Sequence, residues 1–264
     1  MNWDELVEKQ GEKNEQGDVI SFSISARGLE TLPTEIGQLT ALSRLSISRN
    51  QLRALPGEIG QLSSLTCLNI LMNQLRALPP EIGQLITLTK LFVPGNQLQT
   101  LPGEIGQLSS LTYLNISMNQ LRALPPEIGQ LITLTKLFVQ WNRLQTLPAE
   151  IGQLINLTVL DVSHNQLQTL PTEIGQLSSL TYLNASYKQL QTLPPISPCC
   201  HINGAPFNLV RNSHKQWKKR AKTALSYAIC WVRKRKAGRR DKLVALPRMV
   251  TRHVIRLLFG GYDE

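Results

Sequence analysis

Apolar residues recur along most of the chain at a fixed spacing of 23 positions. The octapeptide LPTEIGQL begins at Leu32, and close copies of it follow at the same interval, beginning at Leu55, Leu78, Leu101, Leu124, Leu147 and Leu170. Each unit reads LPxEIGQLxxLxxLxIxxNQLxx with small variations. A fixed period of this length is typical of a solenoid, in which each unit buries its apolar side chains by stacking on its neighbours.

Within a unit, the pattern predicts one short strand and a return segment. Apolar and polar residues alternate over residues 42–47, so Leu45 is expected to point inward while Arg44 and Ser46 point outward. The LPxEIGQL stretch is expected to bring the chain back on the other side of the coil. Its proline fixes one backbone dihedral, and Gly37 suits a tight, non-helical backbone.

One inward column of the repeat is polar. It is asparagine in six successive units, at Asn50, Asn73, Asn96, Asn119, Asn142 and Asn165. An inward amide can bond backbone groups of neighbouring coils that would otherwise be buried unpaired, so we predict a structural ladder. The column changes to Arg27 and Lys188 at its ends, which we interpret as the first and last coils.

This pattern resembles that of leucine-rich repeat proteins with 23-residue units. It is most similar to the bacterial intracellular type, whose LPxEIGQL and NQL motifs also occur in Roco proteins and Ras-binding scaffolds. The resemblance covers about residues 18–195. It implies an α/β repeat solenoid, a curved rod with a parallel sheet on its concave face, and a protein partner bound there. Roco proteins carry a GTPase domain, but GxxxxGK[ST] is absent from this sequence, so that activity is not expected.

We therefore expect four segments. Residues 1–18 form an N-terminal cap, and residues 19–195 form the solenoid, with seven full repeats, partial end repeats and about eight strands. Residues 196–212 are proline-rich and read as a linker. Residues 213–264 form a basic helical tail.

An internal duplication locates a candidate binding face. Residues 55–100 and 101–146 are nearly identical and differ at five pairs of positions: Cys67/Tyr113, Leu71/Ser117, Pro94/Gln140, Gly95/Trp141 and Gln97/Arg143. All five lie among the outward strand positions and the turn that follows. Exposed positions that are free to change would also explain this distribution. However, the exposed Glu and Gln of LPxEIGQL are the same in both blocks. We therefore predict that these columns bind a partner.

The candidate partner-binding residues are lysines and ring-bearing side chains at these positions: Lys90, Phe92, Tyr113, Lys136, Phe138, Trp141, His164, Tyr182 and Tyr187. Exposed aromatic residues commonly serve as interface anchors, and residues 136–187 are the richest stretch. The alternative is that the rings merely pack on one another along the sheet.

Charge is distributed unevenly. Residues 1–195 hold 12 Lys and Arg against 15 Asp and Glu, whereas residues 196–264 hold 16 against 3. Two amphipathic helices are predicted at about 213–237 and 246–259. Their candidate anion-binding residues are Lys218, Lys219, Arg220, Arg233, Lys234, Arg235, Arg248, Arg252 and Arg256. Such helices can cap the solenoid or hold a partner helix, lie on an anionic membrane, or grip a nucleic-acid backbone, and an absence of any specific role stays open.

The sequence offers little chemistry for catalysis. No nucleophile with a base and an orienting group stands out, so we expect neither an enzyme nor a cofactor. The vicinal Cys199 and Cys200 lack a second spaced pair, so we expect no metal site. The first twelve residues lack the apolar stretch of a signal peptide. We expect a monomer in the cytoplasm, with peripheral membrane attachment as the alternative.

Overall fold

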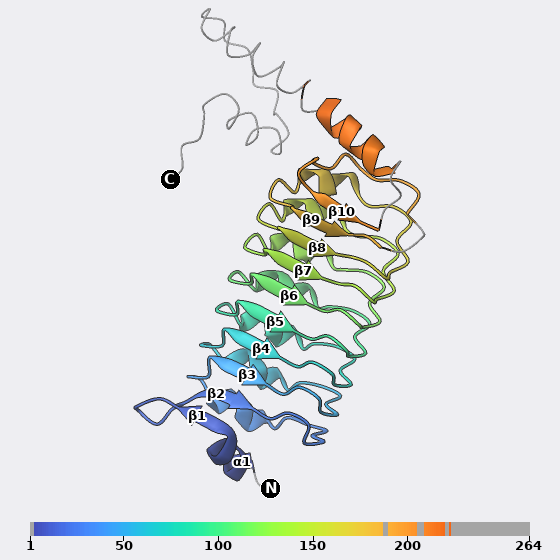
Figure 1. Ribbon diagram of the computed structural model, residues 1–264. Helices are drawn as coiled ribbons and strands as arrows, with labels where there is room; N and C mark the ends of the chain where they lie inside the picture. The colour runs from blue at the N-terminus through green and yellow to red at the C-terminus, as the bar shows by residue number, and fades with distance from the viewer. Residues whose placement is uncertain (1–2, 187–189, 205–208, 220–221, 223–264) are drawn as a thin grey trace, which may run out of the picture.

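The computed structural model describes residues 3–186, 190–204, 209–219 and 222. Successive coils stack into a rod with one sheet along its length (Figure 1). The sheet has ten strands in chain order: β1 Gly11–Lys13, β2 Val19–Ser23, β3 Arg44–Ser46, β4 Cys67–Asn69, β5 Lys90–Phe92, β6 Tyr113–Asn115, β7 Lys136–Phe138, β8 Val159–Asp161, β9 Tyr182–Asn184 and β10 His201–Asn203. Strands β2 to β10 pair in parallel, whereas β1 pairs with β2 in antiparallel fashion. The predicted solenoid is confirmed, with an added strand at each end.

The return segments form short 3-10 helices on the side opposite the strands. They are η1 Thr34–Gln38, η2 Gly57–Gln61, η3 Pro80–Gln84, η4 Gly103–Gln107, η5 Pro126–Gln130, η6 Ala149–Gln153 and η7 Thr172–Gln176. The predicted non-helical backbone at Gly37 is therefore wrong. Its glycine column serves close approach instead, because a Cβ on Gly83 would lie 2.6 Å from the carbonyl oxygen of Glu104 in the next coil. Paired strands lie only about 4.8 Å apart, so the strand side is the shorter, concave side of the rod.

The core is a continuous column of leucine and isoleucine side chains between the strands and the 3-10 helices. The predicted asparagine ladder runs beside it and is confirmed. In Asn119, the side-chain Nδ2 donates to the carbonyl oxygens of Val93, Ile116 and Ser117 at 3.0, 3.1 and 3.0 Å. Its Oδ1 accepts from the backbone N–H of Leu98 at 3.0 Å. One amide thus satisfies groups of two successive coils, its own and the preceding one.

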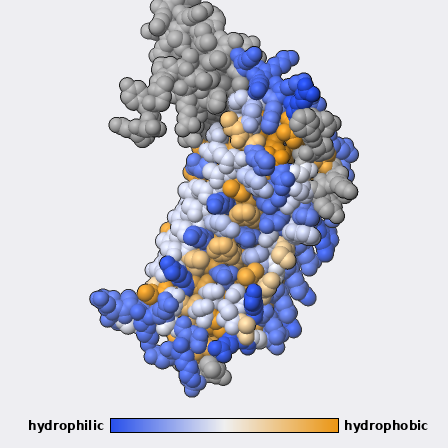
Figure 2. Space-filling model, in the orientation of Figure 1, coloured by the Kyte–Doolittle hydropathy of each residue, from blue (hydrophilic) through white to orange (hydrophobic). Residues whose placement is uncertain are grey.

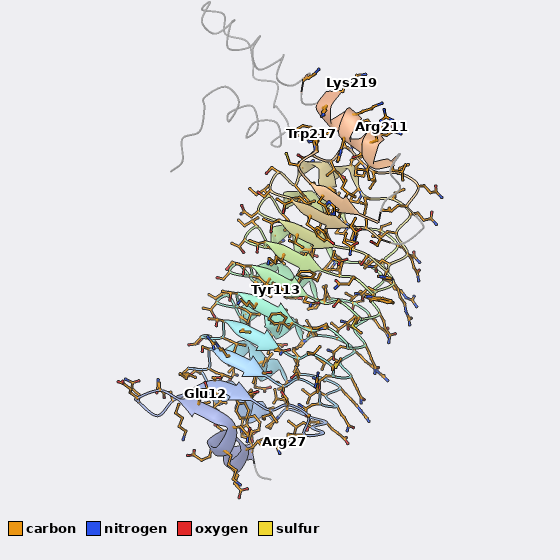
Figure 3. All side chains as sticks on the ribbon, in the orientation of Figure 1. Glu12, Arg27, Tyr113, Arg211, Trp217 and Lys219 are labelled. Carbon is orange, nitrogen blue, oxygen red and sulfur yellow. The ribbon has the colours of Figure 1, made fainter. Side chains whose placement is uncertain are left out.

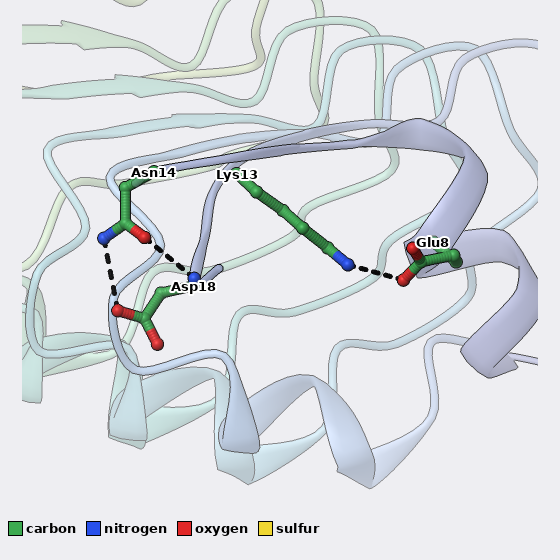
Figure 4. A network of polar contacts seen from close by, with 4 residues as sticks. All are labelled: Glu8, Lys13, Asn14 and Asp18. Carbon is green, nitrogen blue, oxygen red and sulfur yellow. Dashed lines mark hydrogen bonds and ion pairs between the residues drawn. The ribbon is translucent and has the colours of Figure 1, made fainter. Parts of the chain in front are cut away.

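The N-terminal cap covers the first coil with a helix and an edge strand. Helix α1 (Trp3–Gln10) packs Trp3 edge-on against Phe22 of β2, with ring centroids 5.4 Å apart. The turn between β1 and β2 is closed by Asn14, whose Oδ1 accepts from the backbone N–H of Asp18 at 2.8 Å. An ion pair between Lys13 and Glu8 joins β1 to α1 at 2.6 Å (Figure 4).

The C-terminal end differs from the predicted linker over residues 196–212. Strand β10 adds to β9 in parallel, because backbone pairing continues where the repeat motif has already ended. Residues 209–219 are helical, so this helix begins before the predicted residue 213. Its Ser213 hydroxyl donates to the carbonyl oxygen of Pro194 and accepts the N–H of Ile196, and Trp217 is buried (Figure 3). This helix therefore closes the end of the solenoid.

Candidate partner-binding face

The outward side chains of the strands form one long surface, which we call the strand face. It consists of the residues at the positions of Arg44, Ser46 and Arg49 in every coil. Strand pairing keeps these positions aligned, so that Lys90 lies beside Tyr113 and Tyr113 beside Lys136. Figure 2 shows apolar patches along the middle of this face with hydrophilic side chains between and around them.

Three rings form a continuous cluster across β5, β6 and β7. Tyr113 lies between Phe92 and Phe138, with ring centroids 4.8 and 5.3 Å away and planes tilted by 37° and 36° (Figure 3). All three rings are half-buried, whereas Lys90 and Lys136 beside them are exposed. The structure thus brings together five of the predicted residues. The rings do pack on one another along the sheet, which was the alternative to an interface role, but each ring keeps part of its surface open to solvent.

A second aromatic contact lies at the exits of β7 and β8. The indole of Trp141 stacks on the imidazole of His164, with centroids 3.8 Å apart and planes 7° from parallel. Trp141 remains 57% exposed, whereas His164 is half-buried. One face of the indole is therefore covered by His164, and much of the rest of its surface is open.

The backbone at the column of Trp141 is in the left-handed region in seven successive coils. The φ angles are 56° at Ala26, 56° at Arg49, 53° at Met72, 67° at Gly95, 55° at Met118, 59° at Trp141 and 52° at His164. A bulky residue is rare there, because its Cβ approaches the following carbonyl oxygen. Six of these seven coils therefore carry a side chain where glycine would fit with least strain. These side chains form an exposed row along one margin of the strand face, with Met72, Met118 and Trp141 among the most exposed apolar residues.

The C-terminal part of the face is polar. Asp161 accepts the hydroxyl of Ser163 at 2.6 Å and the amide of Asn184 at 2.9 Å, and Asn184 in turn accepts the hydroxyl of Ser186 at 2.6 Å. The sequence interpretation did not include this network. Its signal was available, since Asp161 and Asn184 occupy the outward column of Phe92 and Phe138.

Tyr182 lies in the same register as the other outward residues of its column. Its ring stacks against His201 of β10, with centroids 5.8 Å apart. The sequence interpretation missed His201, because the repeat pattern has ended there and gives no register. The predicted Tyr187 lies outside the described residues.

The described part of the tail presents a basic outer surface. Lys218 and Lys219 are exposed on the terminal helix, whereas its apolar residues Leu209 and Val210 pack against the solenoid core. Burial, followed by the charge of Lys218, lowers the pKa of His214 on this helix. The other predicted tail residues, from Arg220 onward, lie outside the described residues.

The thiols have environments of their own. Cys199 is exposed and Cys200 is buried, and burial raises the pKa of Cys200 to about 11. Burial also raises the pKa of Cys67 on β4, although the nearby Lys90 and Arg44 oppose this shift. Across the described ranges, no three His, Cys, Asp or Glu side chains gather closely enough to hold a metal ion. No described helix is long and apolar enough to cross a membrane.

Comparison with known proteins identifies the repeats. A family model described as leucine rich repeat matches residues 132–190, and a second model of that description matches residues 110–131. No curated protein matches the sequence. The fold and its long strand face define a repeat solenoid of the kind that generally binds other proteins. The family models and the structural neighbours agree on its family: the chain is a leucine-rich repeat protein.

Several solved structures resemble the chain. A leucine-rich repeat protein of Leptospira interrogans is 31% identical over 78% of this chain and 65% of its own, with a TM-score of 0.47. YopM from Yersinia enterocolitica is 30% identical over 70% of this chain and 37% of its own, with a TM-score of 0.54. Toll, in the Toll–Spatzle complex of Drosophila, is 25% identical over 73% of this chain and 28% of its own, with a TM-score of 0.61. The chain thus spans less than two thirds of each of these proteins.

Proposed function

We propose that this chain is a non-enzymatic interaction module whose protein partner docks on the strand face, over β5 to β7 and the Trp141 column. One observation carries the proposal. The two duplicated blocks share their backbone, their core and their asparagine ladder, and their five differences lie on the strand face or in the turns beside it. Variation confined to one surface of a repeat array is expected where that surface sets what is bound.

Trp141 is the strongest single anchor on this surface. It adopts φ 59°, where Gly95 occupies the same position of the earlier block, so the fold does not require an indole there. An exposed tryptophan in a strained backbone is costly to the free chain in two ways, through its strain and through its exposed apolar area. Docking of a partner would remove that area from water, and tryptophan is among the residues that most often dominate interface energies.

The ring cluster adds a second apolar area at the centre of the face. Because Phe92, Tyr113 and Phe138 already contact one another, they lose little side-chain freedom when a partner covers them. Lys90 and Lys136 lie on either side of Tyr113 and supply charged contacts at the margins. An apolar centre with a polar rim is the usual anatomy of a protein interface.

The structural neighbours support a protein as the ligand. Toll, which shares this fold, was solved in complex with the protein Spatzle. The leucine-rich repeat is in general a protein-interaction fold. The partner's position on this chain is our proposal and rests on the residues above.

The test compares three tagged full-length proteins as bait in the same lysate. The first is the parent, and the second carries Trp141→Gly with Phe138→Asn, both of which copy residues found at the same positions of other coils. The third is Ile132→Ser, a matched control, because Ile132 is 58% exposed on the return side of the coil and serine occupies that column in three other coils, at Ser63, Ser109 and Ser178. Bound proteins are quantified by mass spectrometry, and the leading one is purified and titrated against all three.

The proposal expects a partner that the parent and Ile132→Ser bind equally and that the double variant binds at least about tenfold more weakly, a difference of about 1.4 kcal/mol. Both variants should keep the melting temperature of the parent within a few degrees. Equal binding by the double variant would show that the partner does not dock on this part of the strand face.

Binding of the tail to an anionic membrane or nucleic acid is the second candidate. The observation that favours it is the basic outer surface of the terminal helix, where Lys218 and Lys219 are exposed. The apolar side of residues 209–219 packs on the solenoid, so this part of the tail would act through charge alone. Such binding falls steeply with salt, whereas anchoring by rings falls little, and a salt titration separates the two.

A further inference from the structure

Charge in the solenoid is segregated between its two sides. Across residues 31–186, each of the seven 3-10 helices carries one glutamate in its first turn and no basic residue in its last turn. The eight basic residues of this range all lie outside these helices. Four of them are on the strand face, at Arg44, Arg49, Lys90 and Lys136, and the other four lie in the segments that lead from the strand face to the next 3-10 helix: Arg53, Arg76, Arg122 and Arg143. Asp161 is the one acidic residue on the strand face in this range.

The two sets of charges do not neutralise each other. Among the described residues, the structure contains one ion pair, between Lys13 and Glu8 of the cap, and none within the coils. Arg44, Lys90 and Lys136 are exposed. The strand face and its margin therefore carry a positive potential that is available to a ligand.

We infer that the partner of the strand face is an acidic protein segment bound in extended form, with its carboxylates on the basic residues and its apolar side chains on the rings. This inference rests on the proposed function and adds the chemistry of the ligand. It follows from charge complementarity, because an acidic ligand gains from every basic residue on the face and is repelled by Asp161 alone. Carboxylate pairs with lysine and arginine set orientation and encounter rate, while the rings supply the apolar contact.

Strand register fits a peptide that runs along the rod. Lys90 and Lys136 occupy equivalent positions of β5 and β7, separated by Tyr113 on β6. With strands about 4.8 Å apart, their Cα atoms lie roughly 10 Å apart, which an extended chain covers in about three residues. A segment with acidic residues three positions apart and an apolar residue between them would meet Lys90, the ring cluster and Lys136 together.

A peptide suits this face better than a nucleic acid. A nucleic-acid backbone carries a charge on every nucleotide and could not avoid Asp161, which lies beside Phe138 in the pairing of β7 with β8. A peptide can place a neutral or basic residue there. The rings also lie tilted against one another, and His164 covers one face of Trp141, so few faces are free for base stacking. The chain's own tail is excluded as the ligand by its charge, since residues 196–264 hold 16 Lys and Arg against 3 Asp and Glu.

The test starts from a phage-displayed library of random peptides of about twelve residues, a length that spans about eight strands when extended. The library is selected on the full chain, and enriched peptides are synthesised with a fluorescent label. Their dissociation constants are measured for the parent, for Lys90→Glu with Lys136→Glu, and for Trp141→Gly with Phe138→Asn. The matched control is Arg211→Glu with Lys215→Glu, which makes the same change in net charge on exposed residues of the terminal helix. A labelled oligothymidine of the same length is titrated in parallel.

The inference expects enriched peptides with several Asp or Glu. The strand-face charge reversal should weaken them at least about tenfold at about 0.05 M salt and less at about 0.5 M salt, and the Arg211 and Lys215 control should leave them near the parent value. If enriched peptides instead carry no excess of Asp or Glu and still bind less tightly to the Trp141→Gly with Phe138→Asn variant, that result would contradict an acidic ligand but would agree with docking on the strand face. Peptides that bind both strand-face variants with the dissociation constant of the parent would contradict docking on the strand face itself. If oligothymidine binds the parent more tightly than the peptides do, and this binding is lost in Lys90→Glu with Lys136→Glu, the ligand of the strand face is a nucleic acid and not an acidic peptide.

Discussion

The blocks 55–100 and 101–146 fold alike and present different surfaces. Their strands cover matching positions, Cys67–Asn69 against Tyr113–Asn115 and Lys90–Phe92 against Lys136–Phe138, and so do their 3-10 helices. Their asparagine ladders also match, since Asn73 and Asn119 each bond the same three kinds of carbonyl oxygen. The second block nevertheless adds a ring between two phenylalanines, an indole stacked on histidine, and an arginine.

This difference shows which positions of a coil are constrained by the fold. Inward leucines, the asparagine and the glycine of the return segment each satisfy a packing or hydrogen-bonding demand that recurs in every coil. The outward strand positions and the turn after them meet no such demand, so they can change without altering the backbone. The surface that differs between the blocks can therefore change to fit a ligand without a change in the fold.

The largest expected effect tests whether the asparagine ladder stabilises the two blocks equally. Asn73→Ala and Asn119→Ala should each lower the free energy of unfolding by about 1–3 kcal/mol. Each leaves one buried backbone N–H unpaired, that of Leu52 or Leu98, and removes one of the two hydrogen bonds at each of three carbonyl oxygens. The two losses should agree within about 0.5 kcal/mol. Urea unfolding followed by circular dichroism measures them. Gln120→Ala, at a half-buried neighbour, should cost less than about 0.5 kcal/mol, and an equal loss there would show that the ladder has no special role.

The next effect concerns the ring that only the second block has. Tyr113→Cys copies the residue of the first block and removes two ring contacts, each worth about 0.5–1.5 kcal/mol. We expect a loss of about 1–2 kcal/mol in the same unfolding measurement. A loss below the error of the method would mean that the three rings rest on the surface without stabilising the solenoid.

A smaller effect is expected at the left-handed position. Trp141→Gly relieves about 1–2 kcal/mol of backbone strain, but it frees the unfolded chain by about 0.5–1 kcal/mol and removes the stack on His164. These terms nearly cancel, so the unfolding free energy should change by less than about 1 kcal/mol. Gly95→Trp in the first block provides the reciprocal variant, and it should be the more costly of the two, because a side chain there would meet Met72.

The smallest effect concerns the thiol at the first of the five differing positions. Cys67 is half-buried and its pKa is raised by burial, and the pKa of Cys200 is raised to about 11, so both are protonated near pH 8. Cys199 is exposed and should react with iodoacetamide faster than either, as peptide mass spectrometry can show. Raising the pH toward 11 should speed the reaction of Cys200. Rapid reaction of Cys200 at pH 8 would contradict its burial.

Much of the fold could be predicted from the sequence, because a fixed period of 23 residues allows few architectures. The inward leucines and the asparagine ladder followed from alternation and from backbone hydrogen-bonding demands. The 3-10 helices did not, since glycine in the return segment suggests a loop and acts instead through close approach between coils. Strand β10 and His201 were missed, because pairing continues past the last recognisable motif.

The candidate site could be predicted in part. The columns of the duplication pointed to the face, and the structure shows which of its rings touch. The left-handed backbone at Trp141 and the network around Asp161 were not foreseen, because both depend on turn geometry that the periodic pattern does not encode. The segregation of charge between the two sides could have been read from the column positions, since the glutamates and the basic residues occupy different columns.

The most direct test of the central claim makes the two blocks identical. Tyr113→Cys, Ser117→Leu, Gln140→Pro, Trp141→Gly and Arg143→Gln are combined in one chain, and its urea unfolding and its binding to the partner or selected peptide are measured beside the parent. The account predicts cooperative unfolding with a loss of no more than about 2 kcal/mol, together with binding at least about tenfold weaker. Unchanged binding, or failure of this chain to fold, would contradict the claim that these five positions serve recognition and not the fold.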